Sequence, residues 1–368
     1  MSTGLRGKEA FMARQKAYPW EGKIVHHSAV GGIETSVTDD GPGRGNRVAW
    51  VNTGSGLRFK VVIDRGLDIV DAFYNEHSLA WLSHGGITGP QPHANSGIEW
   101  LYSFAGGLVT TCGLTHVGGP NEDAPMNRGL HDRVSNLRGA VESIIQPDPV
   151  EGRLEMSIMG VVKHSMVFGP NLEMRRTIAC TLGSPVIRIR DVVTNRGNLP
   201  CPHMLLYHCN FGWPLVDEGA DIVYKGACRS FGRDIDDAVF NSGRNYRKCP
   251  GPLESHRGFG EGCGVIDVKP DSKGLCTAGI ANEKIGLAVK ITWKKRQLPA
   301  LTNWQHWGFG DYVTGLEPGT NPPIGQNAAR QQKTLIMLAP GKSRTYELEI
   351  AAISGEKEVR SFIQSGGE

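Results

Sequence analysis

Two polar residues interrupt an apolar stretch near the middle of the chain, PHMLLYHCNFGWPLVDEG, residues 202–219. The stretch is typical of a buried β-strand, but His208 and Asn210 stand where further aliphatic residues would fit. Side chains on a strand alternate between its two faces, so both residues should share the face of Met204 and Leu206. An imidazole and an amide on an otherwise apolar face lead us to expect a polar ligand there.

Four further glycine-rich segments carry polar side chains at the predicted ends of strands. These segments are VVIDRGLDIVDA with Arg65 and Asp68, GGLVTTCGLTHVGGPN with His116, RGLHDRVSN with His131, Asp132 and Arg133, and YVTGLEPGTNPP with Glu317. With His208, they suit general acid–base chemistry in which a histidine and a glutamate act on opposite sides of a small polar substrate. A single histidine in such a segment is more often a hydrogen-bonded structural residue.

An aromatic run, NWQHWGFGDY at residues 303–312, precedes Glu317. Trp304 and Trp307 are both able to stack on a sugar ring, whose C–H faces are apolar. For each tryptophan, a position in the hydrophobic core is an equally good interpretation.

Strand-like segments joined by short turns make up most of the chain. The interruptions fall at Arg65–Gly66 within 57–75, at 147–152 within 140–162, at LGSP within 172–198 and at APGK within 334–353. Short connections predict antiparallel pairing, because parallel strands need long crossovers. We therefore predict an all-β chain folded as one large β-sandwich, with short helices over 5–18 and 355–366.

Composition excludes several classes of protein. The 368 residues carry a net charge of only +3, which does not favour nucleic-acid binding. No apolar run is long enough to cross a membrane, and the N-terminus lacks the apolar core of a signal peptide. The eight cysteines have no CxxC spacing, which predicts free thiols in the cytoplasm rather than a zinc site.

The ordered motifs GLHDRVSN, YHCNFG and GLEPGTNPP resemble those of the aldose 1-epimerase (galactose mutarotase-like) superfamily. With RGLDI and LEPGTN, the chain is most similar to the DUF4432-type branch, over roughly residues 50–353. The resemblance implies an antiparallel β-supersandwich over residues 21–355. An N-terminal helical extension, 1–20, and a C-terminal tail, 356–368, would flank it.

The resemblance also implies an isomerase that interconverts sugar anomers by opening and reclosing the ring. In that mechanism Glu317 is the base and His208 is the acid, and neither a cofactor nor a metal is needed. The substrate-binding residues that we expect around the sugar are His131, His116, Arg65, Arg133, Asn210 and Trp304. Asp132 stands where the family has a glycine, and the family's upstream arginine has no clear counterpart here. We also expect a homodimer.

Two other functions are compatible with the same residues. One is a metal-dependent isomerase, epimerase or lyase acting on an oxidised sugar, with His116, His131, His208 and Glu317 as ligands. The other is a non-catalytic sugar-binding protein on the same scaffold, because a fold does not determine function.

Overall fold

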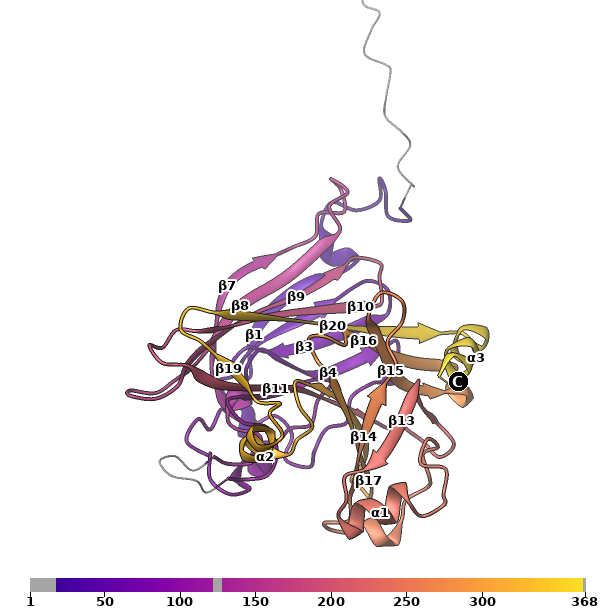
Figure 1. Ribbon diagram of the computed structural model, residues 1–368. Coiled ribbons are helices and arrows are strands. Elements are labelled where there is room, and N and C mark those ends of the chain that lie inside the picture. Colours follow the sequence, from indigo (N-terminus) through magenta and orange to yellow (C-terminus); the bar gives the residue numbers. More distant parts are fainter. Residues whose placement is uncertain (1–17, 122–127, 367–368) are drawn as a thin grey trace, which may run out of the picture.

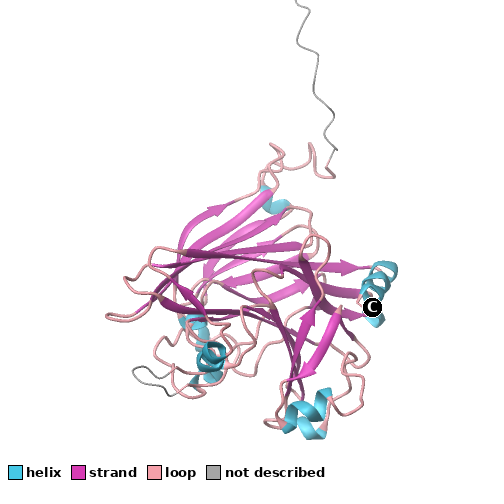
Figure 2. Cartoon of the chain, in the orientation of Figure 1, coloured by secondary structure: helices cyan, strands magenta, loops and turns pink. Residues whose placement is uncertain are grey.

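Antiparallel β-sheets dominate the computed structural model, which describes residues 18–121 and 128–366 (Figures 1 and 2). The helix predicted over 5–18 lies, apart from its last residue, outside the described residues. None of the described helices is long and apolar enough to span a membrane. All eight cysteines are free thiols.

The strands form three sheets, and every pair within them is antiparallel. The five-stranded sheet has the order β1 (Gly32–Val37), β2 (Arg47–Asn52), β3 (Leu57–Val62), β4 (Asp68–Tyr74), β5 (His77–Ser78). The eight-stranded sheet has the order β12 (Asp221–Tyr224), β15 (Leu275–Asn282), β16 (Leu287–Lys294), β20 (Ser343–Ser354), β10 (Val186–Asn195), β9 (Asn171–Thr181), β8 (Glu155–Ser165), β7 (Gly139–Ile145). The seven-stranded sheet has the order β13 (Gly226–Ser230), β14 (Gly262–Val268), β17 (Ala300–Trp307), β18 (Tyr312–Gly319), β11 (Cys201–Gly212), β19 (Ile336–Leu338), with β6 (Thr110–Leu114) also paired to β11. This architecture confirms the predicted antiparallel all-β fold.

Strand β11 has two different faces, as its alternating sequence predicts. Leu205, Tyr207 and Phe211 lie in the large core that all three sheets share. Met204 and Leu206 point the other way, into a second cluster. That cluster includes aromatic residues from the segments around 81, 100 and 304. His208 therefore leaves the strand on the side of this smaller, aromatic cluster.

Most of the predicted turns are confirmed, and one strand pair is not. Strands β3 and β4 flank Arg65–Gly66, and β7–β8 and β9–β10 pair as hairpins. The strands on either side of APGK, however, belong to different sheets, since β19 pairs with β11 and β20 with β10 and β16. Asn195 explains the separation, because its side chain donates to Leu338 O and its backbone bonds to the turn.

The described part of the chain has three short α-helices beside the sheets: α1 (Asp234–Phe240), α2 (Gly325–Gln331) and α3 (Glu356–Ser365). Helix α3 confirms the helix predicted over 355–366, and its Val359 and Phe362 are buried against the eight-stranded sheet. Helices α1 and α2 were not predicted, because seven residues are too few to show a helical period. The division of the chain at residues 20 and 355 stays a prediction.

Candidate active site

His208 and Glu317 face each other across two neighbouring strands. The register of β11 and β18 pairs Leu206 with Gly319 and Cys209 with Leu316, so His208 lies opposite Glu317. Directly opposed side chains of an antiparallel pair are close neighbours. Here Nε2 of His208 lies 3.2 Å from Oε1 of Glu317. The fold thus brings together the two residues predicted to act as acid and base.

Burial controls the charge of this pair. The side chains of His208 and Glu317 are only 7% and 3% exposed. Loss of water disfavours the charged form of both groups. Burial therefore lowers the pKa of His208 to about 4. It raises the pKa of Glu317 well above its usual value, and the negative charge of Glu261 raises it further. Near neutral pH, these directions favour a neutral imidazole beside a protonated carboxyl.

A cavity of about 680 Å³ is lined by His208 and Glu317 together with several aromatic rings. The ring of Trp304 lies edge-on to the His208 ring, with the centroids 5.5 Å apart. Phe104 lies 5.2 Å from the same imidazole and stacks on Trp100 at 4.3 Å. Trp81, at the base of the wall, meets the edge of Trp304. A cavity with apolar walls and a few polar groups suits a small molecule that has both apolar and polar faces.

His131 presents a hydrogen-bond donor to this cavity. It is 9% exposed, and its ring lies 5.9 Å from that of His208. The backbone N–H of Gly118 donates to its Nδ1, which leaves Nε2 to carry the proton. Burial, followed by the neighbouring His208, lowers the pKa of His131 well below its usual value. His131 is therefore a neutral N–H donor, as expected of a residue that binds a sugar hydroxyl.

A left-handed turn holds His131 in place. His131 and Asp132 have φ angles of +58° and +60°, which side chains other than glycine rarely adopt. The Asp132 carboxylate compensates by accepting hydrogen bonds from Thr115 N and Oγ1, at 2.9 and 2.7 Å. It also accepts from the backbone of Arg133. Asp132 therefore holds the turn against Thr115, the residue that follows β6.

Glu261 and Arg233 form a charged wall that sequence reasoning missed. Glu261 accepts a 2.8 Å hydrogen bond from the indole N–H of Trp304. Its other oxygen accepts from both terminal nitrogens of Arg233, which also pairs with Asp236 at the start of helix α1. Both Glu261 and Arg233 line the cavity. This chain of bonds fixes the tryptophan and supplies polar groups on the wall.

Two predicted binding residues lie behind the cavity wall rather than in it. Both ring nitrogens of His116 are engaged by backbone groups, Nδ1 with Gln326 N and Nε2 with Gly119 O. Asn210 is fully buried and donates to Gly107 O and to the carbonyl of His208. Neither side chain lines the cavity.

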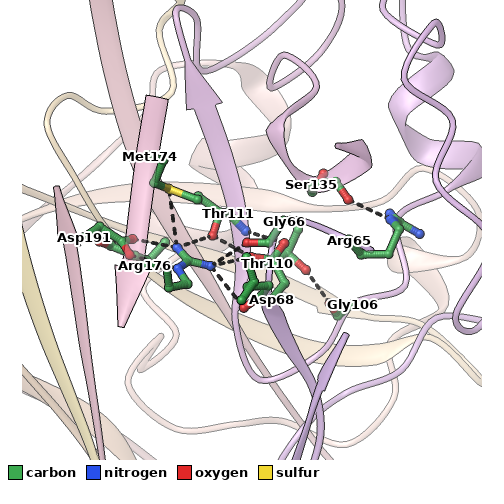
Figure 3. Close-up of polar contacts among 12 residues, drawn as sticks. Arg65, Gly66, Asp68, Gly106, Thr110, Thr111, Ser135, Met174, Arg176 and Asp191 are labelled. Carbon is green, nitrogen blue, oxygen red and sulfur yellow. Dashed lines mark hydrogen bonds and ion pairs between the residues drawn. The ribbon is translucent and has the colours of Figure 1, made fainter. Parts of the chain in front are cut away.

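The two arginines predicted to hold the substrate donate to carbonyl oxygens of loops. Arg65 is 5% exposed, and its guanidinium donates to Ser135 O (Figure 3). It also donates to Ser103 O and to both oxygens of Thr88. Arg133 donates to Pro92 O, and neither arginine lines the cavity. These guanidiniums satisfy the carbonyl oxygens of loops that contain no regular ladder. The structure brings neither guanidinium into this cavity, and their predicted role in binding the substrate stays a prediction.

A fully buried ion network supports β11 from the core side. Arg176 on β9 pairs with Asp68 at 2.8 Å and with Asp191 at 2.6 Å (Figure 3). Thr111 on β6 bonds to Arg176 and Asp68, and Tyr207 on β11 donates to Asp191. Tyr207 immediately precedes His208, so this network anchors the strand that carries the proposed catalytic imidazole. Asp68 has this structural role and does not reach the cavity.

The aromatic wall contains the other residues that sequence reasoning missed. Trp81, Trp100 and Phe104 reach the cavity from loops remote in sequence from β11, and no local pattern marks them. Glu261 carried a weak signal, because it stands in the glycine-rich stretch GFGEGCG just before β14. Trp307, by contrast, is fully buried in the main core beside Tyr312, so only Trp304 is placed to stack on a ligand.

The ligand set of the metal-dependent alternative is not assembled. His116 is turned toward backbone groups, and His131 accepts a backbone N–H at Nδ1. Over residues 18–121 and 128–366, no three histidine, cysteine, aspartate or glutamate side chains are grouped so as to hold a metal ion.

Antiparallel sheets around a cavity that holds His208 and Glu317 give the chain a galactose mutarotase-like fold. The chain belongs to the family described as Domain of unknown function (DUF4432), whose model matches residues 43–352. No curated protein matches the chain in sequence.

Solved structures support this fold. A Klebsiella pneumoniae protein provisionally named an aldose 1-epimerase superimposes with a TM-score of 0.80 at 23% identity, covering 90% of this chain and 86% of that one. A galactose mutarotase-like protein from Clostridium acetobutylicum gives 0.59 at 11% identity, over 88% and 98% of the two chains. A galactose 1-epimerase from Lactobacillus acidophilus gives 0.53 at 10% identity, over 88% and 99%. At these identities, the likeness concerns the fold alone.

Proposed function

We propose that this protein is an isomerase that interconverts the anomers of a sugar. The observation that carries the proposal is the contact between His208 and Glu317, 3.2 Å apart beneath an aromatic cavity. Ring opening requires one proton to be delivered at the ring oxygen and another to be removed from the anomeric hydroxyl. A buried pair in which one side chain holds a proton and the other can accept one is suited to both transfers.

The pKa directions favour a particular assignment of roles. With Glu317 protonated and His208 neutral, the carboxyl donates a proton to the ring oxygen, and Nε2 of the imidazole takes the proton of the anomeric hydroxyl. The C1–O5 bond breaks, the open-chain aldehyde rotates about C1–C2, and ring closure returns both protons. This assignment is the reverse of the one that the family resemblance implies, although the same two residues act.

The walls of the cavity support a sugar as the ligand. The C–H face of a sugar can stack on Trp304 or Trp100, whose rings line the cavity. The Nε2–H of His131 and the carboxylate of Glu261 are placed to bind hydroxyl groups beyond the anomeric centre. No step of this mechanism uses a group from outside the chain.

A screen of aldoses tests the proposal. Freshly dissolved single anomers are followed by polarimetry or NMR exchange spectroscopy, and at least one should equilibrate faster with the protein than without it. Binding of a sugar without acceleration would favour the non-catalytic sugar-binding protein. Acceleration that is lost on chelation would favour the metal-dependent alternative.

A further inference from the structure

Two buried polar atoms at the acid–base pair make no hydrogen bond in the structure, either with each other or with any other described residue. They are Nδ1 of His208 and Oδ1 of Asn210. Buried polar atoms in a native protein are nearly always paired, so two orphans on adjacent side chains need an explanation. His208 and Asn210 are two positions apart on β11 and therefore leave the strand on the same face.

The orientation of the Asn210 amide is fixed by its other bonds. Its Nδ2 donates to Gly107 O at 3.0 Å and to His208 O at 2.9 Å. A flipped amide would place its oxygen against two carbonyl oxygens, which cannot donate. Oδ1 is therefore the free atom, and it is an acceptor on the side of the imidazole.

We propose that Asn210 is a positioning residue whose Oδ1 accepts the Nδ1 proton of His208 and so fixes the imidazole in one tautomer. Nε2 then carries the lone pair that faces Glu317 and the substrate. In the opposite tautomer, a lone pair on Nδ1 would face the lone pairs of the Asn210 oxygen, which cannot donate a hydrogen bond. Burial lowers the pKa of His208, and the Asn210 side chain offsets part of that decrease, as an acceptor at Nδ1 would.

Asn210 also keeps this arrangement through the reaction. When Nε2 takes a proton from the anomeric hydroxyl, the imidazolium still has Nδ1–H bonded to Oδ1. The ring then has no reason to turn, and Nε2 stays the only nitrogen that exchanges protons. His131, which lines the same cavity, has the opposite tautomer, with the proton on Nε2, because Gly118 N donates to its Nδ1.

Tautomers are measured directly by long-range ¹H–¹⁵N NMR on protein labelled with ¹⁵N-histidine. We expect His208 to be protonated at Nδ1 and His131 at Nε2, with His208→Gln and His131→Gln spectra used for assignment. The His131 signal is an internal comparison from the same cavity. An Nε2-protonated His208 in the wild-type protein would overturn the proposal, whatever the activity of the enzyme.

Kinetics of two variants separate positioning from structural support, and this part rests on the proposed anomerase activity. Asn210→Leu removes the acceptor and the donors, whereas Asn210→Asp keeps the acceptor, loses the donors and adds a negative charge. We expect Leu to lower kcat by about tenfold or more with little change in KM. Asp should lose less kcat, and its charge should move the acidic limb of the pH profile to higher pH.

Asn195→Asp is the matched control, because Asn195 also donates from Nδ2 to two carbonyl oxygens, Leu199 O and Leu338 O, far from the cavity. It should lower thermal stability to a similar degree and leave the pH profile unchanged. Equal kcat losses in Asn210→Leu and Asn210→Asp, without movement of the acidic limb, would show a purely structural role. If neither variant folds, the wild-type NMR tautomer alone decides.

Discussion

Removal of either member of the acid–base pair should nearly abolish catalysis, because ring opening needs both the proton that Glu317 delivers and the proton that His208 removes. His208→Ala and Glu317→Gln should each lower kcat by about a hundred- to ten-thousand-fold, the usual contribution of a positioned acid or base. That range corresponds to about 3–5 kcal/mol of barrier. The burial of both side chains favours the upper half of the range, since bulk water has little access to replace the missing group.

The double variant tests whether the residues act as a unit. With Nε2 of His208 only 3.2 Å from Oε1 of Glu317, loss of one residue deprives the other of its proton partner. The double variant should therefore be only slightly slower than the slower single variant, not slower by the product of both effects. Multiplicative losses would mean that the two residues act in separate steps.

The assay is the first-order rate of anomer equilibration for the best sugar of the panel, corrected for the spontaneous rate. Two matched controls are Glu347→Gln, a carboxylate paired with Lys294 on another sheet, and His77→Ala on the short strand β5. Both should retain wild-type rates, and thermal unfolding should show that every variant is folded. If His208→Ala and Glu317→Gln anomerise the sugar at near-wild-type rates, the proposed mechanism is wrong.

Three further predictions concern charge and stability. Glu261→Gln keeps an acceptor for the Trp304 indole but removes a negative charge that raises the pKa of Glu317. The alkaline limb of the pH profile of kcat/KM should therefore move to lower pH. An unchanged alkaline limb would contradict an effect of Glu261 on the pKa of Glu317. Arg65→Met should lower the free energy of unfolding, measured with urea, by about 3 kcal/mol or more at unchanged KM, because it leaves buried carbonyls unpaired. A higher KM with an unchanged free energy of unfolding would indicate instead that Arg65 binds the substrate. Burial lowers the pKa of His203 in the folded protein to about 4, below the value near 6.5 in the unfolded chain. The free energy of unfolding should therefore decrease by about 3 kcal/mol as the pH falls from about 6.5 to about 4. His203→Phe should show a flatter dependence of unfolding free energy on pH over this range, and an unchanged slope would refute the assignment.

Much of the fold was predictable, because the strands follow a strict period of two. Alternation along β11 correctly separates Tyr207 and Phe211 in the main core from Met204 and Leu206 in the aromatic cluster. Short turns correctly predict antiparallel hairpins. The strands around APGK belong to different sheets because Asn195, more than 140 residues away in sequence, forms hydrogen bonds with that turn. A local sequence pattern does not indicate such a distant contact.

The candidate site was only partly predictable, since the same residue types serve two purposes in glycine-rich turns. His208, Glu317, His131 and Trp304 all line one cavity. Arg65 stands in equally suggestive sequence, yet its guanidinium holds loop carbonyls. Both environments are polar, irregular and close to strand ends, so composition cannot separate them. Whether such a side chain contacts the ligand or binds backbone groups depends on its position in the tertiary structure.

The degree of hydrogen-bond satisfaction distinguishes the two kinds of buried polar group in this fold. Around Arg176, each carboxylate is met by the guanidinium and by a hydroxyl, which is how a buried charge is tolerated for structural purposes. On the opposite face of β11, His208 and Asn210 each have an unpaired buried atom, and so does Glu317 on the neighbouring strand β18. Unpaired buried atoms cost stability, and a protein retains them where a ligand or a moving proton supplies the missing partner. One strand therefore separates a closed polar network, which holds the fold, from an open one, which is available for chemistry.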